Sequence, residues 1–236
     1  MRSIFNFGVP GLYEELSPAL RGLLDTSGTI IKYADGQLIQ TRGDKTRGFS
    51  IIKSGAVCFG KTDAEGRFIT SVVYEPGQCY GEFTVLAGLP RTHDGIAVGE
   101  TSICHISKAT FDRLLADEPA LAAPILASLT LRLHSLLEWA DDLRRYPLKV
   151  RLGKQLLALV RAPAKGTASS LTVTQGDLAE LMGVSRVAVA KILADYQRRG
   201  FVRLGYGKIE ITNPNALEIW LQQFVQLDPI SAAKQE

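Results

Sequence analysis

The chain has 236 residues, and its hydrophobic fraction of 46% and charged fraction of 22% are those of a folded globular protein rather than a disordered one. No apolar run approaches the roughly 18 residues that are needed to span a bilayer, so we expect no membrane partner. Residues 1–16 have neither the long apolar core nor the small-residue cleavage site of a signal peptide, which predicts a cytoplasmic protein.

Charge is divided unevenly along the chain. Residues 1–146 contain 15 basic and 17 acidic residues, whereas residues 147–236 contain 12 basic and 7 acidic residues. A basic C-terminal third favours an anionic partner for that part of the protein, although many solvated surfaces are also basic.

Metal sites and catalytic groups are not indicated by the sequence. Cys58, Cys79 and Cys104 are widely spaced and form no CxxC pair, so we interpret them as buried or half-buried thiols. The three histidines are also scattered. No Ser/His/Asp grouping and no P-loop is found. We therefore expect no catalytic residues, no metal and no enzymatic activity.

Residues 28–108 are rich in glycine and contain short β-branched and aromatic runs, such as GTIIKY, GFSIIKSGAVCFGK, RFITSVVY and TSICHIS. Turn signals recur every 8–12 residues and predict an all-β sandwich or barrel. A short helix is predicted before it, near residues 18–24. The predicted turns lie at residues 35–36, 42–44, 53–55, 64–66 and 75–77.

The hydrophobic period changes in residues 109–145. Apolar residues follow one another at spacings of three and four, which is the pattern of a helix with a narrow coiled-coil seam. We predict that this helix forms a parallel homodimer; the alternative is a helix that packs on its own domain. Pro147 is expected to end or kink the helix. The seam consists of Leu126, Leu129, Leu133, Leu136, Ala140 and Leu143.

Residues 148–212 predict a second compact unit. LKVRLGKQLLALV is an amphipathic helix, residues 162–170 form a small-residue loop, and Thr174 caps a helix that begins near residue 176. A tight turn at Gly183 and a further helix follow. FVRL and KIEIT then form a hairpin with Gly205, Tyr206 and Gly207 at its turn. This order of elements is that of a winged helix-turn-helix.

The stretch LAELMGVSRVAVAKIL explains how such a helix pair could read DNA. Ala179 is small enough for a close helix crossing, and Ser185 is expected to cap the second helix. That helix would leave Arg186, Val187 and Lys191 on its outer face, where arginine can bind guanine in the major groove. The alternative is an ordinary helical corner with a solvated arginine. The predicted DNA-binding residues are Thr174, Gln175, Ser185, Arg186, Val187, Lys191 and Lys208.

Two motifs resemble the catabolite-activator/FNR (Crp–Fnr) family of bacterial transcription regulators. VTQGDLAELMGVSRVAVAKIL is similar to the DNA-binding motif of the family, and YGEFTVLAGLPRTHDGIA is similar to its phosphate-binding cassette. The resemblance implies an α+β chain with three parts and a tail. These are a cyclic-nucleotide-binding-type β-roll (1–108), a long dimerisation helix (109–146), a winged helix-turn-helix (147–220) and a C-terminal tail (221–236).

The cassette implies a site for an effector. In the cyclic-AMP binders of the family, the positions that match Gly81, Glu82, Arg91 and Thr92 hold ribose and cyclic phosphate. Leu136 and Leu137 stand where those proteins carry a Thr-Ser pair that meets adenine, so cyclic AMP, cyclic GMP, another ligand and no ligand all stay open. Glu82 and Arg91 could also pair internally. The expected effector-binding residues are Gly81, Glu82, Phe83, Arg91, Thr92, Arg132, Leu136 and Leu137.

The resemblance also implies a function and partners. We expect a homodimeric transcription regulator that binds double-stranded DNA with a two-fold site and contacts RNA polymerase. Val187 and Lys191 replace a glutamate and an arginine that often read TGTGA-like half-sites, so a different half-site is expected. The alternative is a cyclic-nucleotide-binding or adaptor module for which DNA binding is secondary.

Overall fold

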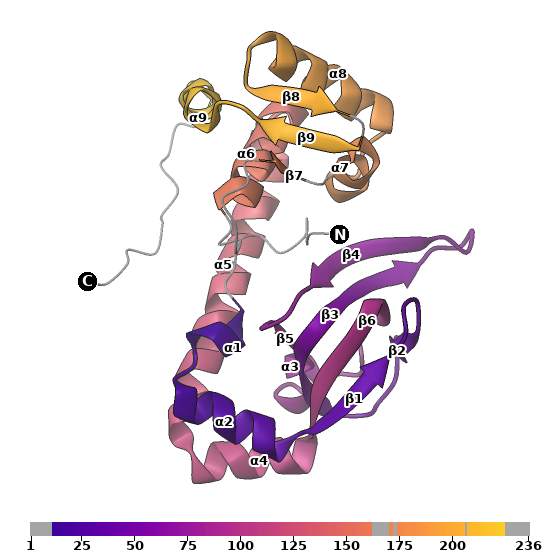
Figure 1. Ribbon diagram of the computed structural model, residues 1–236, viewed down its shortest axis with the longest axis vertical. Helices are drawn as coiled ribbons and strands as arrows, with labels where there is room; N and C mark the ends of the chain where they lie inside the picture. The colour runs from indigo at the N-terminus through magenta and orange to yellow at the C-terminus, as the bar shows by residue number, and fades with distance from the viewer. Residues whose placement is uncertain (1–10, 162–169, 172–173, 206, 225–236) are drawn as a thin grey trace. The chain divides into compact units, whose positions relative to one another are not determined.

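The computed structural model describes residues 11–161, 170–171, 174–205 and 207–224. The chain divides within one long helix into two compact units, residues 1–137 and 138–236. Each unit is described separately below (Figure 1).

The N-terminal unit is built around an antiparallel sheet with the strand order β1-β6-β3-β4, in which β2 also pairs with β6 and β5 with β3. Two long strands, β3 (Gly48–Thr62) and β6 (Asp94–Ser107), form its centre and pair with each other along most of their length. This arrangement confirms the β-roll that the sequence predicts. The remaining elements are α1 (Leu12–Glu15), α2 (Pro18–Ser27), β1 (Thr29–Tyr33), β2 (Leu38–Gln40), β4 (Phe68–Tyr74), β5 (Cys79–Tyr80) and α3 (Glu82–Val85).

Helices close one end of this roll. Helices α2 and α4 (Lys108–Asp117) lie at the end where β1 begins and β6 ends (Figure 1). Their apolar side chains enter a buried core that also contains Phe49 and Ile106, and the rings of Phe49 and Phe111 lie 5.1 Å apart. Leu121, just before the long helix α5 (Ala122–Arg145), and Ile125, in its first turn, are buried in the same core.

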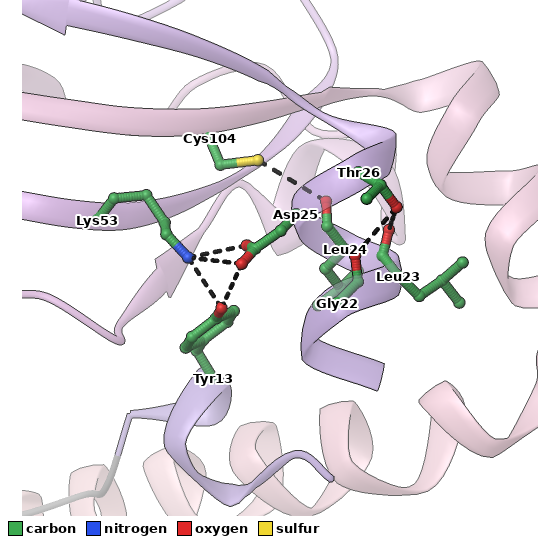
Figure 2. A network of polar contacts seen from close by, with 8 residues as sticks. All are labelled: Tyr13, Gly22, Leu23, Leu24, Asp25, Thr26, Lys53 and Cys104. Atoms are coloured by element: carbon green, nitrogen blue, oxygen red, sulfur yellow. Dashed lines mark hydrogen bonds and ion pairs between the residues drawn. The ribbon is translucent and has the colours of Figure 1, made fainter. Parts of the chain in front are cut away.

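A polar network fastens the two N-terminal helices to β3 (Figure 2). The ammonium group of Lys53 donates to both carboxylate oxygens of Asp25, at 2.8 and 3.0 Å, and to the hydroxyl of Tyr13 at 2.9 Å. That hydroxyl donates to Asp25 at 2.5 Å, and Lys53 also lies over the Tyr13 ring. Burial alone would raise the pKa of Asp25, but the hydrogen bonds from Lys53 and Tyr13 lower it below its usual value.

The turn predicted at residues 53–55 was wrong. These residues lie inside β3, whose pairing with β6 continues on both sides of two register shifts. Gly55 has a φ of +72°, and a Cβ at this position would lie 2.4 Å from Oγ1 of Thr101. The glycine therefore produces a bulge within one long strand, where the sequence suggested two strands joined by a turn.

The single helix predicted for residues 109–145 was also wrong. Helix α4 ends at Asp117, a 3-10 turn follows at Pro119–Leu121, and helix α5 spans Ala122–Arg145. Glu118 has an extended φ of −132°, because the ring of the following proline disfavours a helical conformation before it. Phe111 and Leu114 of α4 belong to the core of the β-roll.

The expectation that no segment could span a membrane needs a correction. Residues Pro119–Arg145 are long and apolar enough to cross a bilayer by length and composition alone. Long helices of proteins in water meet the same criterion. This one carries Arg132, whose guanidinium pairs with Glu82 of the β-roll.

The C-terminal unit contains α6 (Leu148–Arg161), α7 (Gln175–Met182), α8 (Arg186–Arg198) and a small sheet of order β7-β9-β8. An aromatic cluster of Tyr196, Phe201 and Trp220, with ring centroids 5.6–5.9 Å apart, forms part of its core. The Tyr196 hydroxyl also donates to the carbonyl of Lys149 on α6. The remaining elements are β7 (Ser170–Leu171), β8 (Val202–Gly205), β9 (Lys208–Ile211) and α9 (Pro214–Gln222).

The predicted winged helix-turn-helix is confirmed within this unit, with two additions. Ser170, expected in a loop, lies in β7 and pairs with Glu210. Most of helix α9 was not predicted from the sequence. Its Leu217 is fully buried, and the helix packs against α6. Tyr206 at the tip of the hairpin, most of the loop at 162–169 and the tail after residue 224 lie outside the described residues.

Candidate functional site

A cavity of about 420 Å³ opens in the N-terminal unit between the β-roll, the cassette at α3 and helix α5. Seven of the eight expected effector-binding residues line it. Leu137 does not line it, and its side chain is 57% exposed. The expected residues on the cavity wall are Gly81, Glu82, Phe83, Arg91, Thr92, Arg132 and Leu136.

Gly81 allows the cassette to fold closely against β3. Its φ is +101°, and a Cβ there would lie 2.1 Å from the carbonyl oxygen of Gly48 and 2.9 Å from Nη1 of Arg91. The same carbonyl accepts hydrogen bonds from Arg91 Nη2 and from the hydroxyl of Thr84, both at 3.2 Å. Any larger residue at position 81 would push the cassette away from the strand.

Glu82 and Arg132 form an ion pair within the cavity wall. Arg132 Nη1 donates to Glu82 Oε1 at 2.8 Å, and its Nη2 donates to the carbonyl of Cys79 at 3.2 Å. Burial raises the pKa of the Glu82 carboxyl, and the Arg132 guanidinium opposes that shift without cancelling it. The internal partner of Glu82 is therefore Arg132, and the internal pairing of Glu82 with Arg91 that the sequence left open is not formed.

Arg91 is also buried, with 7% of its surface exposed. Its guanidinium donates to the Gly48 carbonyl at 3.2 Å and lies 5.9 Å from the centre of the Tyr80 ring. Among the residues that the structure describes, none forms an ion pair with Arg91, and burial lowers its pKa. The guanidinium can therefore accept an anion that enters the cavity.

Thr92 and His93 extend the polar end of the cavity. The Thr92 hydroxyl lies 2.9 Å from Nδ1 of His93, and Nε2 of Gln40 donates to the His93 carbonyl at 2.9 Å. Burial lowers the pKa of His93, and the positive charges of Lys61 and Arg42 lower it further. The Asp94 carboxylate opposes this shift without cancelling it.

Most of the cavity wall was not predicted from the sequence. The unpredicted residues are mainly apolar, and most of the apolar ones come from β3, β4, β5 and α5. The alternation of β4, in which Val72 and Tyr74 share one face, is a signal that could have suggested two of them. The unpredicted apolar and aromatic lining residues are Phe59, Val72, Tyr74, Tyr80, Pro90, Leu129 and Leu133.

A second concave site, of about 470 Å³, lies in the C-terminal unit between α7, α8 and the β8–β9 hairpin. Four of the seven residues predicted to bind DNA line it, namely Thr174, Gln175, Arg186 and Lys208. Ser185, Val187 and Lys191 do not line the groove but are exposed at the start of α8 and along it. The structure therefore brings the predicted residues to neighbouring surfaces of one unit.

Local sequence signals set the geometry of α7 and α8. The Thr174 hydroxyl accepts from the Asp177 amide at 3.1 Å, and the Asp177 carboxylate accepts from the Thr174 amide at 2.9 Å, which makes a complete capping box. Gly183 ends α7 with a φ of +64°, and the Ser185 hydroxyl accepts from the Ala188 amide at 3.2 Å. The predicted caps and turn are confirmed.

The two faces of α8 differ in chemistry. Val189, Leu193 and Tyr196 are fully buried, whereas Val187, on the opposite side, is 78% exposed. Within the described residues, no carboxylate pairs with the guanidinium of Arg186. An exposed arginine, valine and lysine on one helix face have the chemistry to contact a base edge, a thymine methyl group and a phosphate.

Comparison with known proteins matches each unit to a domain family. Residues 30–118 match the sequence model of the cyclic nucleotide-binding domain, and residues 150–220 match that of the Crp-like helix-turn-helix domain. The chain belongs to the Crp–Fnr family of transcription regulators. As a Crp–Fnr protein it is a DNA-binding regulator, and the family is one of regulators rather than enzymes.

Relatives cover most of this Crp–Fnr chain. A CRP-like cAMP-activated global transcriptional regulator of Mycobacterium tuberculosis is 26% identical over 88% of this chain and 94% of its own length. The cyclic AMP receptor protein of Thermus thermophilus is 28% identical over 79% of this chain and 85% of its own length. The crystal structure of the Thermus thermophilus catabolite activator protein covers 91% of this chain and all of that one, with 26% identity and a TM-score of 0.52.

Proposed function

We propose that this regulator acts as a homodimer, binds a two-fold DNA site through the outer face of α8, and responds to a small effector in the cavity of the β-roll. The observation that carries the proposal is the exposed face of Arg186, Val187 and Lys191 beside the groove that contains Lys208. The two half-sites of the DNA would lie about one helical turn apart, about 10 base pairs from centre to centre.

The roles of the individual DNA contacts follow from their chemistry. Arg186 is at the first position of α8, where its guanidinium can bind guanine O6 and N7 together. Val187 can contact a thymine methyl group. Lys191 and Lys208 are suited to phosphate, and the exposed amides at the start of α7 and α8 favour phosphate as well.

Dimerisation is supported by the exposed seam of α5. Leu126, Leu133, Leu136 and Leu143 are all exposed in the single chain although they repeat at coiled-coil spacing. Burying such a row between two parallel helices removes apolar surface from water. The same helix forms part of the cavity wall, so an effector could alter the dimer and with it the placement of two DNA-binding units.

Effector control requires a difference in binding. A ligand shifts the protein toward the DNA-competent arrangement only if it binds that arrangement more tightly than the other. Cyclic AMP and cyclic GMP are candidates, since the matched domain is a cyclic nucleotide-binding domain and one relative is named as cAMP-activated. We further propose a cytoplasmic location and contact with RNA polymerase, in keeping with the family.

The test is a DNA-binding titration at several salt concentrations. We expect the purified protein to bind duplexes drawn from its own promoter region, with a dissociation constant that rises steeply with salt because counterions are displaced from phosphates. Arg186→Ala should weaken binding to the duplex that the unmodified protein binds most tightly. Arg113→Ala, a change on the exposed surface of α4 in the N-terminal unit, should leave that binding unchanged. Weak binding that depends little on salt would favour an adaptor module over a DNA-binding regulator.

A further inference from the structure

The wall of the effector cavity is mostly hydrocarbon. Aromatic rings and aliphatic side chains from the sheet cover one side, and leucines of α5 cover the other. A ligand that fills this volume gains most by presenting apolar surface to it. The α5 side consists of Leu129, Leu133 and Leu136, with Phe59, Val72, Tyr74 and Tyr80 facing from the sheet.

The charges of the cavity wall leave one cation without a carboxylate partner. Glu82 and Arg132 neutralise each other through the 2.8 Å ion pair. Burial alone would lower the pKa of Arg132, but the Glu82 carboxylate raises it above its usual value. Arg91, by contrast, is buried with only a backbone carbonyl as its hydrogen-bond acceptor among the described residues. Burial lowers its pKa, and Asp44 and Glu82, which form no ion pair with it, oppose that shift without cancelling it. The wall therefore matches a ligand with a single negative charge.

The position of Arg91 fixes the place of that charge. Thr92 and His93 follow it along the chain and line the same part of the cavity. The fields of Lys61 and Arg42 reach His93 there. A planar carboxylate can accept two hydrogen bonds from the fork of one guanidinium, so it suits this end of the cavity.

A ligand with many hydroxyl groups or a polar base edge fits the α5 side of this wall less well. One oxygen of the Glu82 carboxylate, Oε1, already accepts from Arg132 and is less available to a ligand hydroxyl. Leu129, Leu133 and Leu136 offer no hydrogen bonds, and polar groups buried against them would lose their water without replacement. The hydrocarbon wall and the single unpaired cation therefore favour the same type of molecule.

We propose that the cavity binds a small amphipathic carboxylate, with its carboxylate at Arg91 and Thr92 and its hydrocarbon body against Tyr74 and the leucines of α5. This proposal rests on the effector site proposed above and names the class of its ligand. The body contacts α5 directly, so binding would act on the helix that we propose forms the dimer.

The experiment is calorimetric titration of the full-length protein with sodium octanoate, together with comparison probes. Octan-1-ol has the same body without the charge, and acetate has the charge without the body. Cyclic AMP and cyclic GMP test whether the cavity binds a cyclic nucleotide instead. We expect octanoate to bind at least tenfold more tightly than each of these probes.

Two variants separate the cavity from other apolar surfaces. Arg91→Met should remain folded by circular dichroism and should bind octanoate and octan-1-ol with affinities that differ less than threefold. Arg113→Met, which removes an exposed arginine of α4 outside the cavity, should bind octanoate as the unmodified protein does. If Arg91→Met does not fold, Thr92→Val serves in its place and should weaken the binding of octanoate more than the binding of octan-1-ol.

The outcomes distinguish this inference from the function on which it rests. Tighter binding of either cyclic nucleotide than of octanoate, or no heat with octanoate, would overturn the inference. DNA binding is measured on the same preparation. Intact DNA binding with no octanoate binding refutes the ligand class alone, whereas loss of salt-dependent DNA binding refutes the proposed function.

Discussion

The guanidinium of Arg132 on α5 donates a hydrogen bond to the carboxylate of Glu82 on α3, with 2.8 Å between Nη1 and Oε1. The two residues are 50 positions apart in the chain, and the side chains are 22% and 10% exposed. This contact ties the cassette to the long helix. A change in the position of the cassette would therefore disturb a contact of α5.

Removal of Arg132 should be costly because it leaves the buried Glu82 carboxylate without a cation. We expect Arg132→Met to lower the free energy of unfolding by about 3 kcal/mol, in the range for one broken partner of a buried pair. The double variant Glu82→Gln/Arg132→Met should recover part of that loss, since no charge is then left unpaired. Urea denaturation of the single and double variants measures both effects. Equal losses in the two would show that the unpaired Glu82 carboxylate is not what costs stability in the single variant.

The capping box at Thr174 makes a prediction for the C-terminal unit. Thr174→Ala should destabilise that unit by about 1 kcal/mol, because the amide of Asp177 loses its acceptor. Thr174→Ser keeps an oxygen at the same place and should cost much less. Thermal unfolding followed by circular dichroism compares the two, and similar losses for alanine and serine would argue against the cap.

The seam of α5 can be tested without DNA. Leu126→Glu and Leu143→Glu each place a charge in the expected dimer contact, and we expect the dimer dissociation constant to rise at least about tenfold, which corresponds to about 1.4 kcal/mol. Leu38→Glu changes an exposed leucine of β2 to the same residue and is the control. Sedimentation velocity gives the oligomeric state. A dimer that survives both seam changes would place the interface elsewhere.

Asp25 predicts how stability depends on pH. Its pKa is lower in the folded protein than in the unfolded chain because Lys53 and Tyr13 bind the carboxylate. The resulting stabilisation is fully present above the unfolded pKa, and it is lost as the pH falls through the folded pKa. The carboxylate is partly exposed, so the effect should stay below about 1 kcal/mol.

Asp25→Asn should therefore flatten the acid limb of the stability profile. The free energy of unfolding, measured by urea titration from neutral pH down to about pH 3, should fall less in the variant than in the unmodified protein. Lys53→Met should flatten the same limb, because it removes the ammonium that favours the ionised carboxylate. An unchanged slope in both variants would mean that other carboxylates govern acid stability.

Local signals in the sequence predicted much of the C-terminal unit. Thr174, Gly183 and Ser185 each act on their nearest neighbours, so their roles as caps and turn can be read without knowledge of the fold. Gly55 shows the limit of such signals. A glycine with positive φ can end a strand or make a bulge within it, and pairing with β6 decides between the two.

The cavity depends on contacts between distant segments. The motif predicted Glu82 and Arg91, but their partners come from distant segments: Glu82 pairs with Arg132 of α5, and Arg91 donates to the Gly48 carbonyl of β3. Leu136 and Leu137 are neighbours in the sequence, yet only Leu136 reaches the cavity, because successive helix residues point about 100° apart. The apolar wall from β4 and α5 could be recognised only in the tertiary structure, because these two segments are far apart in the sequence.

The most direct test of the account is selection of binding sites from random duplex DNA, carried out in parallel with the unmodified protein and with Arg186→Ala. We predict a two-fold motif with half-site centres about 10 base pairs apart. The variant should lose preference at one position in each half-site, at about 1–3 kcal/mol, and should keep its salt-dependent non-specific binding. Two results would contradict the assignment of α8 as the helix that reads the bases. The unmodified protein could select no motif, or the variant could bind all sequences more weakly by the same factor.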